Sequence, residues 1–220
     1  MWRHHASPFL GTRRTPRNSI GARKPAAEVL VEGGASRIAI VSGRIGNWAN
    51  SVRRGAFRQR LDALGLDAVA TEPGDFTYEG GKRAAAAILK GAPRVDAIYA
   101  CNDAMAFGAL DVIRGAGGRV PDDIAVVGFD DVPIAAWDAY RLSTVRQPVD
   151  VLVRHVCEIL RRPEGPLGLI GRSFLHGGDF VHRATTHPVA LRPGEIEECS
   201  GEAAPFPRAR AGLRAKAARR

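Results

Sequence analysis

The chain has 220 residues, which is long enough for one large domain or two small ones with a buried core. Hydrophobic residues make up 45% and charged residues 25%, as is typical of a soluble globular protein, and no apolar run is long enough to span a membrane. The net charge of +9 would ordinarily indicate a polyanionic partner, but the basic excess is confined to residues 1–25 and 188–220. The neutral middle therefore favours solvated basic tails over a nucleic-acid-binding surface.

Cysteine and histidine spacing gives no sign of a metal site. Cys101, Cys157 and Cys199 are far apart, and the six histidines form no ligand cluster. The first residues also lack the continuous apolar segment of a secretory signal. We therefore expect a reduced, cytoplasmic setting, no metal and no cofactor.

Apolar runs alternate with amphipathic stretches along the middle of the chain. The predicted strands are residues 37–43, 67–71, 96–102, 124–130 and 142–145, and the predicted helices are residues 51–65, 78–91, 103–118 and 149–162. Strands of continuous apolar character between helices predict an α/β fold, a doubly wound parallel sheet covered on both faces. Residues 173–186 are predicted to form a strand hairpin that turns on Gly177-Gly178, and the two basic ends are predicted to be disordered.

Polar side chains follow two of these strands. Asn102 and Asp103 come after one strand, Asp130 and Asp131 come after the next, and Arg53 lies in the first turn of a predicted helix. In open α/β sheets ligands bind at the carboxyl ends of the strands, where carboxylates, amides and a guanidinium suit the hydroxyls of a polyol such as a sugar. For Asp103 and Asp131 we favour helix capping, and for Asn102 and Asp130 we favour ligand contact.

Several segments, taken in order, resemble the effector-binding core of LacI/GalR-type bacterial transcription regulators. The matching pieces are NSIGA (18–22), RIAIVSG (37–43), Arg53 with Phe57 four residues later, GDF (74–76), DAIYACNDAMAFGAL (96–110), VPDDIAVVGFDDVPIAAW (120–137) and LSTVRQPVDVL (142–152). The resemblance covers residues 18–187, and the combination is specific although each piece alone is weak.

The resemblance implies a type I periplasmic-binding-protein-like fold, with a sugar or nucleobase-like effector held between two subdomains of a homodimeric, cytoplasmic protein. It also implies five ligand-binding residues and no catalytic ones: Arg53, Phe76, Asn102, Asp130 and Gln147. Phe76 takes the place of an aromatic that stacks on the ligand, and Gln147 follows a crossing between the subdomains. One departure is the order Gly55-Ala56-Phe57, since the family places glycine directly before the aromatic.

A second departure concerns the start of the chain. The family begins with a helix-turn-helix DNA-binding module, a hinge helix and several βα units, and residues 1–17 show no apolar periodicity of that kind. We therefore expect residues 18–187 to be an effector domain truncated at its N-terminal side. DNA would be read only through a module that this sequence lacks.

Two alternative functions remain. A transport-type sugar-binding protein shares the fold, but it would need a signal peptide. The motifs VPDDIAVVGFDD and STVRQP also resemble those of regulators and not those of transport proteins. An enzyme could use Asp130 and Asp131 to hold Mg²⁺ for phosphoryl transfer. The segment after these acids offers no lysine or hydroxyl for that chemistry, and the sequence has no phosphate-binding GxxxxGK[ST] loop.

Overall fold

The structure is a computed structural model, and it describes residues 24–91, 94–161 and 177–189. The predicted tails and the NSIGA segment lie outside the described residues, apart from Pro188 and Val189. The described elements, in chain order, are α1 (Ala26–Glu32), β1 (Ile38–Ser42), α2 (Trp48–Ala63), β2 (Ala70–Pro73), α3 (Tyr78–Gly91), β3 (Ala97–Ala100), α4 (Asp103–Gly115), β4 (Ala125–Asp130), the 3-10 helix η1 (Pro133–Ala136), β5 (Ser143–Arg146), α5 (Val149–Leu160) and β6 (Asp179–Val181).

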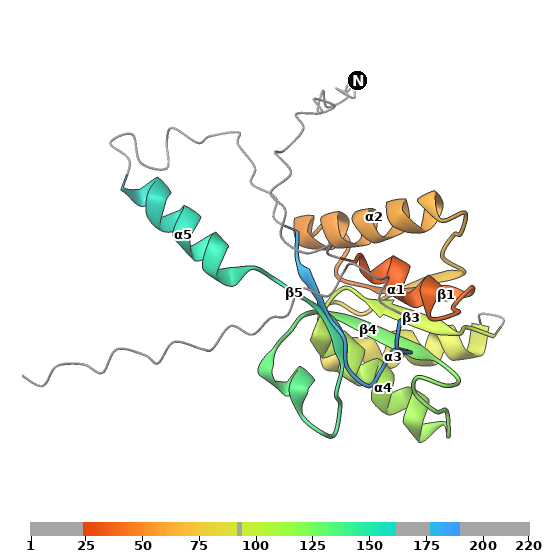
Figure 1. Ribbon diagram of the computed structural model, residues 1–220. Coiled ribbons are helices and arrows are strands. Elements are labelled where there is room, and N and C mark those ends of the chain that lie inside the picture. The colour runs from red at the N-terminus through yellow and green to blue at the C-terminus, as the bar shows by residue number, and fades with distance from the viewer. Residues whose placement is uncertain (1–23, 92–93, 162–176, 190–220) are drawn as a thin grey trace, which may run out of the picture. The chain divides into compact units, whose positions relative to one another are not determined.

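The strands form one sheet in the order β2-β1-β3-β4-β5-β6. The first five are parallel to one another, and β6 runs antiparallel to β5. Helices α1 and α2 lie on one face of the sheet, and α3 and α4 lie on the other (Figure 1). The predicted doubly wound parallel sheet is thus confirmed. Of the predicted hairpin, β6 is the second arm, and the first arm lies outside the described residues.

The centre of the sheet is buried on both faces. Every residue of β1 and β3 is buried, and Ile38 pairs with Ala97 while Val41 pairs with Ala100. β2, at the edge, is only partly buried. Burial on both faces explains why the central strands are continuous apolar runs without the polar alternation of a half-exposed strand.

Two glycines let α3 and α4 approach closely. A Cβ atom at Gly81 would lie 2.3 Å from the backbone oxygen of Met105, and one at Gly108 would lie 2.2 Å from the backbone oxygen of Tyr78. Backbone atoms cannot swing aside as a flexible side chain can. The glycines therefore set the spacing of the two helices that cover this face, and α4 in turn positions the end of β3.

Helix α1 was not predicted from the sequence. It is only seven residues long, follows Pro25 and ends at Gly33-Gly34, so its apolar stripe is too short to be recognised by period. Ala26, Ala27, Val29 and Leu30 are nevertheless buried, and α1 packs against α2.

Helix α5 matches its prediction but contributes no buried residue. Val149, Val153, Val156 and Leu160 are all more than half exposed, and their spacing places them on one face of the helix. This face has no partner within the part of the chain that the structure describes. None of the described helices has the length and apolarity needed to cross a bilayer.

We predict opposite effects for alanine at two helical glycines. Gly108→Ala should lower the free energy of unfolding by about 1–3 kcal/mol, because the added methyl group meets the backbone of α3. Gly55→Ala is the matched control in α2, where nothing lies within 4 Å of the added atom, and it should raise stability by about 0.5–1 kcal/mol. Urea unfolding of both variants tests this, and equal effects would refute the close helix contact.

Candidate functional site

The candidate site lies at the carboxyl ends of β1, β3, β4 and β5. Parallel strands bring their carboxyl ends to the same edge of the sheet, so side chains distant in sequence meet there. Helix α2 contributes Arg53 to this edge, and the loop between β2 and α3 contributes Phe76. All five predicted ligand-binding residues belong to segments that end or begin at this edge.

Arg53 is bound on three sides. Its Nη2 lies 2.9 Å from Oδ1 of Asp130, and its Nη1 donates to the carbonyl oxygen of Cys101 at 2.8 Å. Its guanidinium carbon lies 4.1 Å from the centre of the Phe129 ring, within the range of a cation–π contact. The side chain is 17% exposed, so the arginine is fixed in place but still reachable by solvent.

Asp130 receives a second hydrogen bond on the same oxygen. Nε2 of Gln147 donates to Oδ1 at 2.6 Å, so the structure brings together three predicted site residues, Arg53, Asp130 and Gln147. Burial raises the pKa of Asp130 above its ordinary value, and the charge of Arg53 and the Gln147 hydrogen bond oppose that rise. The result is a partly exposed acceptor whose geometry is already set.

Asn102 has the helix-capping role that was predicted for its neighbour Asp103. Asn102, not Asp103, is the N-cap of α4, because its Oδ1 accepts from the backbone N–H of Met105 at 3.0 Å. Its Nδ2 donates to the backbone oxygen of Phe76 at 3.1 Å, which links the starts of α3 and α4. The prediction that Asp103 caps this helix is therefore wrong, and any ligand contact by Asn102 would share atoms already engaged.

Phe76 lies against the end of β1. A Cβ atom at Gly43 would lie 2.1 Å from its ring, so only glycine leaves room for the aromatic there. Phe76 has φ of 63°, a conformation that non-glycine residues rarely adopt. The hydrogen bond from Asn102 helps to hold this strained backbone. Phe76 thus lies at the end of β1 and packs partly on the core.

Asp131 does not cap the following turn. Val132 is the N-cap residue of η1 and makes no side-chain capping bond, so the predicted role of Asp131 is wrong. Its Oδ1 instead accepts from Nη2 of Arg183 at 2.7 Å, and its Oδ2 from Nε of Arg146 at 2.6 Å. Burial raises the pKa of Asp131, but the two arginines outweigh it and hold that pKa below the ordinary value.

Asp103 is a third carboxylate at this edge and is completely buried. Oδ1 accepts from the hydroxyl of Thr144 at 2.5 Å, and Oδ2 accepts from the backbone N–H of Val132 at 2.9 Å. A Cβ atom at Gly128 would lie 2.2 Å from Oδ1, which explains why β4 carries a glycine just before its aromatic and acidic end. Burial raises the pKa of Asp103 to about 6, against the effect of both hydrogen bonds.

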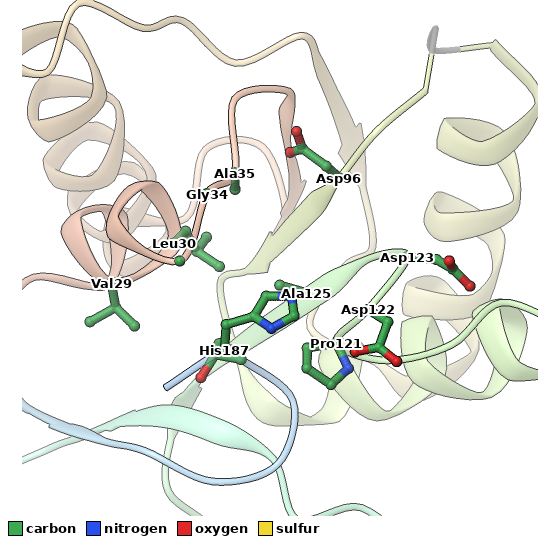
Figure 2. A pocket seen from close by; sticks show the side chains of 12 residues that line it. Val29, Leu30, Gly34, Ala35, Asp96, Pro121, Asp122, Asp123, Ala125 and His187 are labelled. Atoms are coloured by element: carbon green, nitrogen blue, oxygen red, sulfur yellow. The ribbon is translucent and has the colours of Figure 1, made fainter. Parts of the chain in front are cut away.

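A separate small cavity of about 120 Å³ opens at the opposite edge of the sheet (Figure 2). Its acids are Asp96, Asp122 and Asp123, and His187 also lines it. Asp96 accepts hydrogen bonds from the backbone N–H groups of Ser36 and Arg37, and Asp123 accepts one from the guanidinium of Arg119. This cavity contains none of the predicted ligand-binding residues.

The two arginines that hold Asp131 were not predicted from the sequence. Arg183 follows β6, and its contact with Asp131 could not be predicted, because residue types alone do not show that β6 pairs antiparallel with β5. Arg146 precedes Gln147 in the quoted STVRQP motif, so its place could have been noticed. Within the described residues no three His, Cys, Asp or Glu side chains are arranged to hold a metal ion.

Residues 27–166 match the sequence family described as "Periplasmic binding protein-like domain". This match covers more than half of the chain. The chain belongs to this family. The predicted fold class and the resemblance to LacI/GalR-type regulators are both confirmed, since its relatives by sequence and by structure include such regulators.

One curated relative is the HTH-type transcriptional regulator CelR of Thermobifida fusca, 37% identical over 145 residues. That match covers 65% of this chain and 43% of the regulator, so this member of the family spans less than half of the relative's length. Among solved structures, the complex of the transcriptional regulator CelR with cellobiose has a TM-score of 0.63 at 32% identity. It matches 73% of this chain and 50% of that one.

A second solved structure is the lac repressor dimer bound to operator and the anti-inducer ONPF. Its TM-score is 0.65 at 27% identity, with 72% of this chain and 55% of that chain covered. The relatives are thus transcriptional regulators, some of them solved with a sugar or with operator DNA.

The ionisation of Asp103 should make the protein less stable as pH rises from about 4 to about 7. The folded-state pKa, about 6, lies above the ordinary value, so the folded protein binds this proton more tightly than the unfolded chain. This contribution is fully present below about pH 4 and is lost as pH rises through 6. The loss should be on the order of 2–3 kcal/mol.

Asp103→Asn isolates this effect, because asparagine does not ionise and the Thr144 hydroxyl can accept from its amide. Urea unfolding of both proteins at pH steps measures the difference. If the two stability curves run parallel from about pH 4 to 7, Asp103 does not titrate as the buried site requires.

Proposed function

We propose that this chain is the ligand-sensing part of a LacI-type transcription regulator, and that a sugar-like effector binds at Arg53 and Asp130. The observation that carries the proposal is the fixed pair of a guanidinium and a carboxylate at the carboxyl edge of the sheet. A sugar hydroxyl is both a donor and an acceptor. It can therefore donate to Asp130 and accept from Arg53 at the same time.

The surrounding groups suit the same class of ligand. Gln147 holds Asp130 in place, and it offers amide atoms beside it. The ring of Phe76 lies at the end of β1, where an aromatic can pack on the apolar face of a pyranose. Arg53, Phe76, Asn102, Asp130 and Gln147 remain our proposed ligand-binding set, with Asn102 acting mainly through the position of Phe76.

The relatives support a sugar over a nucleobase. CelR is solved with cellobiose, and a LacI family regulator from Arthrobacter sp. FB24, related in structure, is solved with lactose. This chain spans only part of such proteins. We therefore also propose that it works as a cytoplasmic homodimer, and that DNA is bound through a separate helix-turn-helix module.

The apolar face of α5 supports association with another surface. Helix α4, by contrast, buries most of its apolar residues within this chain.

An enzyme that holds Mg²⁺ with Asp130 and Asp131 is not favoured by the geometry. Both carboxylates are already paired with arginines, and a guanidinium repels a divalent cation from the same oxygens. The relatives are regulators and not phosphoryl-transfer enzymes. A transport-type binding protein would use the same cleft chemistry, but the relatives reported above favour regulation.

Asp130→Ala should weaken sugar binding by about 1–3 kcal/mol, roughly a 5- to 150-fold increase in Kd, because the ligand hydroxyl loses its acceptor. Isothermal titration against cellobiose, lactose, ribose and a purine nucleoside measures this on the full chain. Asp62→Asn, an exposed carboxylate near the far end of α2, is the control and should leave Kd unchanged.

Two outcomes would contradict the proposed function. One is a parent chain that binds none of these ligands up to millimolar concentration. The other is an Asp130→Ala variant that keeps the parental Kd for a ligand that the parent does bind.

A further inference from the structure

Two adjacent acids end β4 in an unusual backbone conformation. Asp130 has φ of 120° and Asp131 has φ of 57°, both in the region that favours glycine. Side chains in this region are strained, so surrounding contacts must hold the backbone there. The consequence of the conformation is that the two carboxylates take different partners: Asp130 meets Arg53, and Asp131 meets Arg146 and Arg183.

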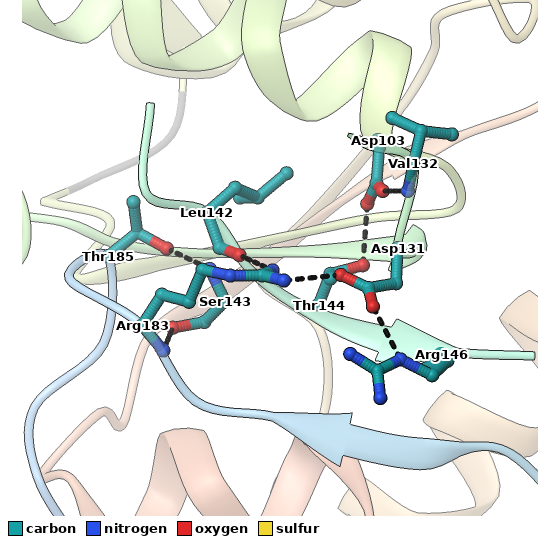
Figure 3. A network of polar contacts seen from close by, with 9 residues as sticks. All are labelled: Asp103, Asp131, Val132, Leu142, Ser143, Thr144, Arg146, Arg183 and Thr185. Carbon is teal, nitrogen blue, oxygen red and sulfur yellow. Dashed lines mark hydrogen bonds and ion pairs between the residues drawn. The ribbon is translucent and has the colours of Figure 1, made fainter. Parts of the chain in front are cut away.

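The contacts of Asp131 are the stronger candidates for holding this backbone. Its side chain is only 6% exposed, compared with 25% for Asp130, and each of its oxygens has its own arginine (Figure 3). A buried carboxylate that receives charge-assisted hydrogen bonds on both oxygens has little freedom to rotate. Asp131 is therefore a fixed point next to a residue that we place in the ligand site.

Arg183 is the better anchored of the two arginines. It is 17% exposed while Arg146 is 58% exposed, and its Nη1 also donates to the carbonyl oxygen of Leu142 at 2.7 Å. Its backbone N–H donates to the hydroxyl of Ser143 at 2.9 Å. One guanidinium thus ties the end of β4 to the beginning of β5 and to the segment after β6.

The other side of the turn is fixed as well. The N–H of Val132 donates to Asp103, whose second oxygen accepts from Thr144 on β5. Asp131 is consequently held through its side chain, and the next peptide is held through its N–H. Of the three acids at this edge, only Asp130 is in a position to contact the proposed ligand.

We propose that Asp131 and Arg183 form a positioning clamp, which holds the strained end of β4 so that Asp130 faces Arg53 without Asp131 itself touching the ligand. The effect on ligand affinity rests on the proposed function. The effect on the Arg53–Asp130 pair does not, because that pair is present without ligand.

A double-mutant cycle on stability tests the clamp without any ligand. Arg53→Gln removes the partner of Asp130, and Arg183→Gln releases the clamp. If the clamp positions Asp130, then Arg53 contributes less once Arg183 is gone, because it loses the Asp130 contact but keeps those to Cys101 and Phe129. The factor by which Arg53→Gln changes the unfolding equilibrium constant should be at least about threefold smaller in the Arg183→Gln background than in the parent.

The matched control uses an arginine at the opposite edge of the sheet. Arg119 makes a two-pronged contact with Asp123 there, and Arg119→Gln should be additive with Arg53→Gln to within about twofold. Both cycles are measured by urea unfolding in about 0.5 M NaCl, where direct repulsion between distant arginines is screened. If Arg183→Gln does not fold, Arg183→Lys replaces it, since lysine keeps the charge but cannot reproduce the fork.

Additive effects of Arg53 and Arg183 would overturn the clamp. A second readout follows cellobiose affinity by isothermal titration, where Asp131→Asn should raise Kd at least about fivefold. An unchanged Kd in this variant would also overturn it. A parent chain that binds no sugar would refute the proposed function, while the stability cycle would still decide the clamp.

Discussion

The carboxyl edge of the sheet depends on one constraint: three carboxylates there are partly or fully buried, and each needs hydrogen-bond donors in place of water. Asp103, Asp130 and Asp131 meet at one edge of the sheet, and removing each from water is costly unless donors replace the lost hydration. Arg53, Arg146 and Arg183 supply the charges, and Thr144, Gln147 and the N–H of Val132 supply neutral donors. The three acids differ in what they can do because their partners differ.

The partners come largely from one short segment. β5 and the residue after it provide Thr144 for Asp103, Arg146 for Asp131 and Gln147 for Asp130. A shift of this strand by one residue would turn these side chains to the wrong face, so the pairing of β5 with β4 and β6 fixes the chemistry of the edge. Ligand recognition and fold stability are therefore linked at the same residues, and substitutions here are expected to affect both.

The sequence was enough to predict the central strands, the longer helices and the edge at which polar residues gather. Continuous apolar runs and helical periods are local signals, and the rule that strand ends meet at one edge needs no side-chain detail. The roles of individual acids could not be read in this way. The sequence does not show whether Asn102 or Asp103 caps α4, or whether Asp131 caps a turn or binds arginines. These roles depend on which distant segment of the chain packs against each acid. Arg183 reaches Asp131 from 52 residues away.

The most direct test is a pH titration of the three carboxyl groups by ¹³C NMR, assigned with single Asp→Asn variants. Three separate midpoints are expected. Asp103 should titrate near pH 6, Asp130 above the ordinary range of an aspartate, and Asp131 below it, because burial dominates the first two and the arginines dominate the third. If all three titrate together near the ordinary pKa of about 4, the acids are neither buried nor separately paired, and the account is wrong.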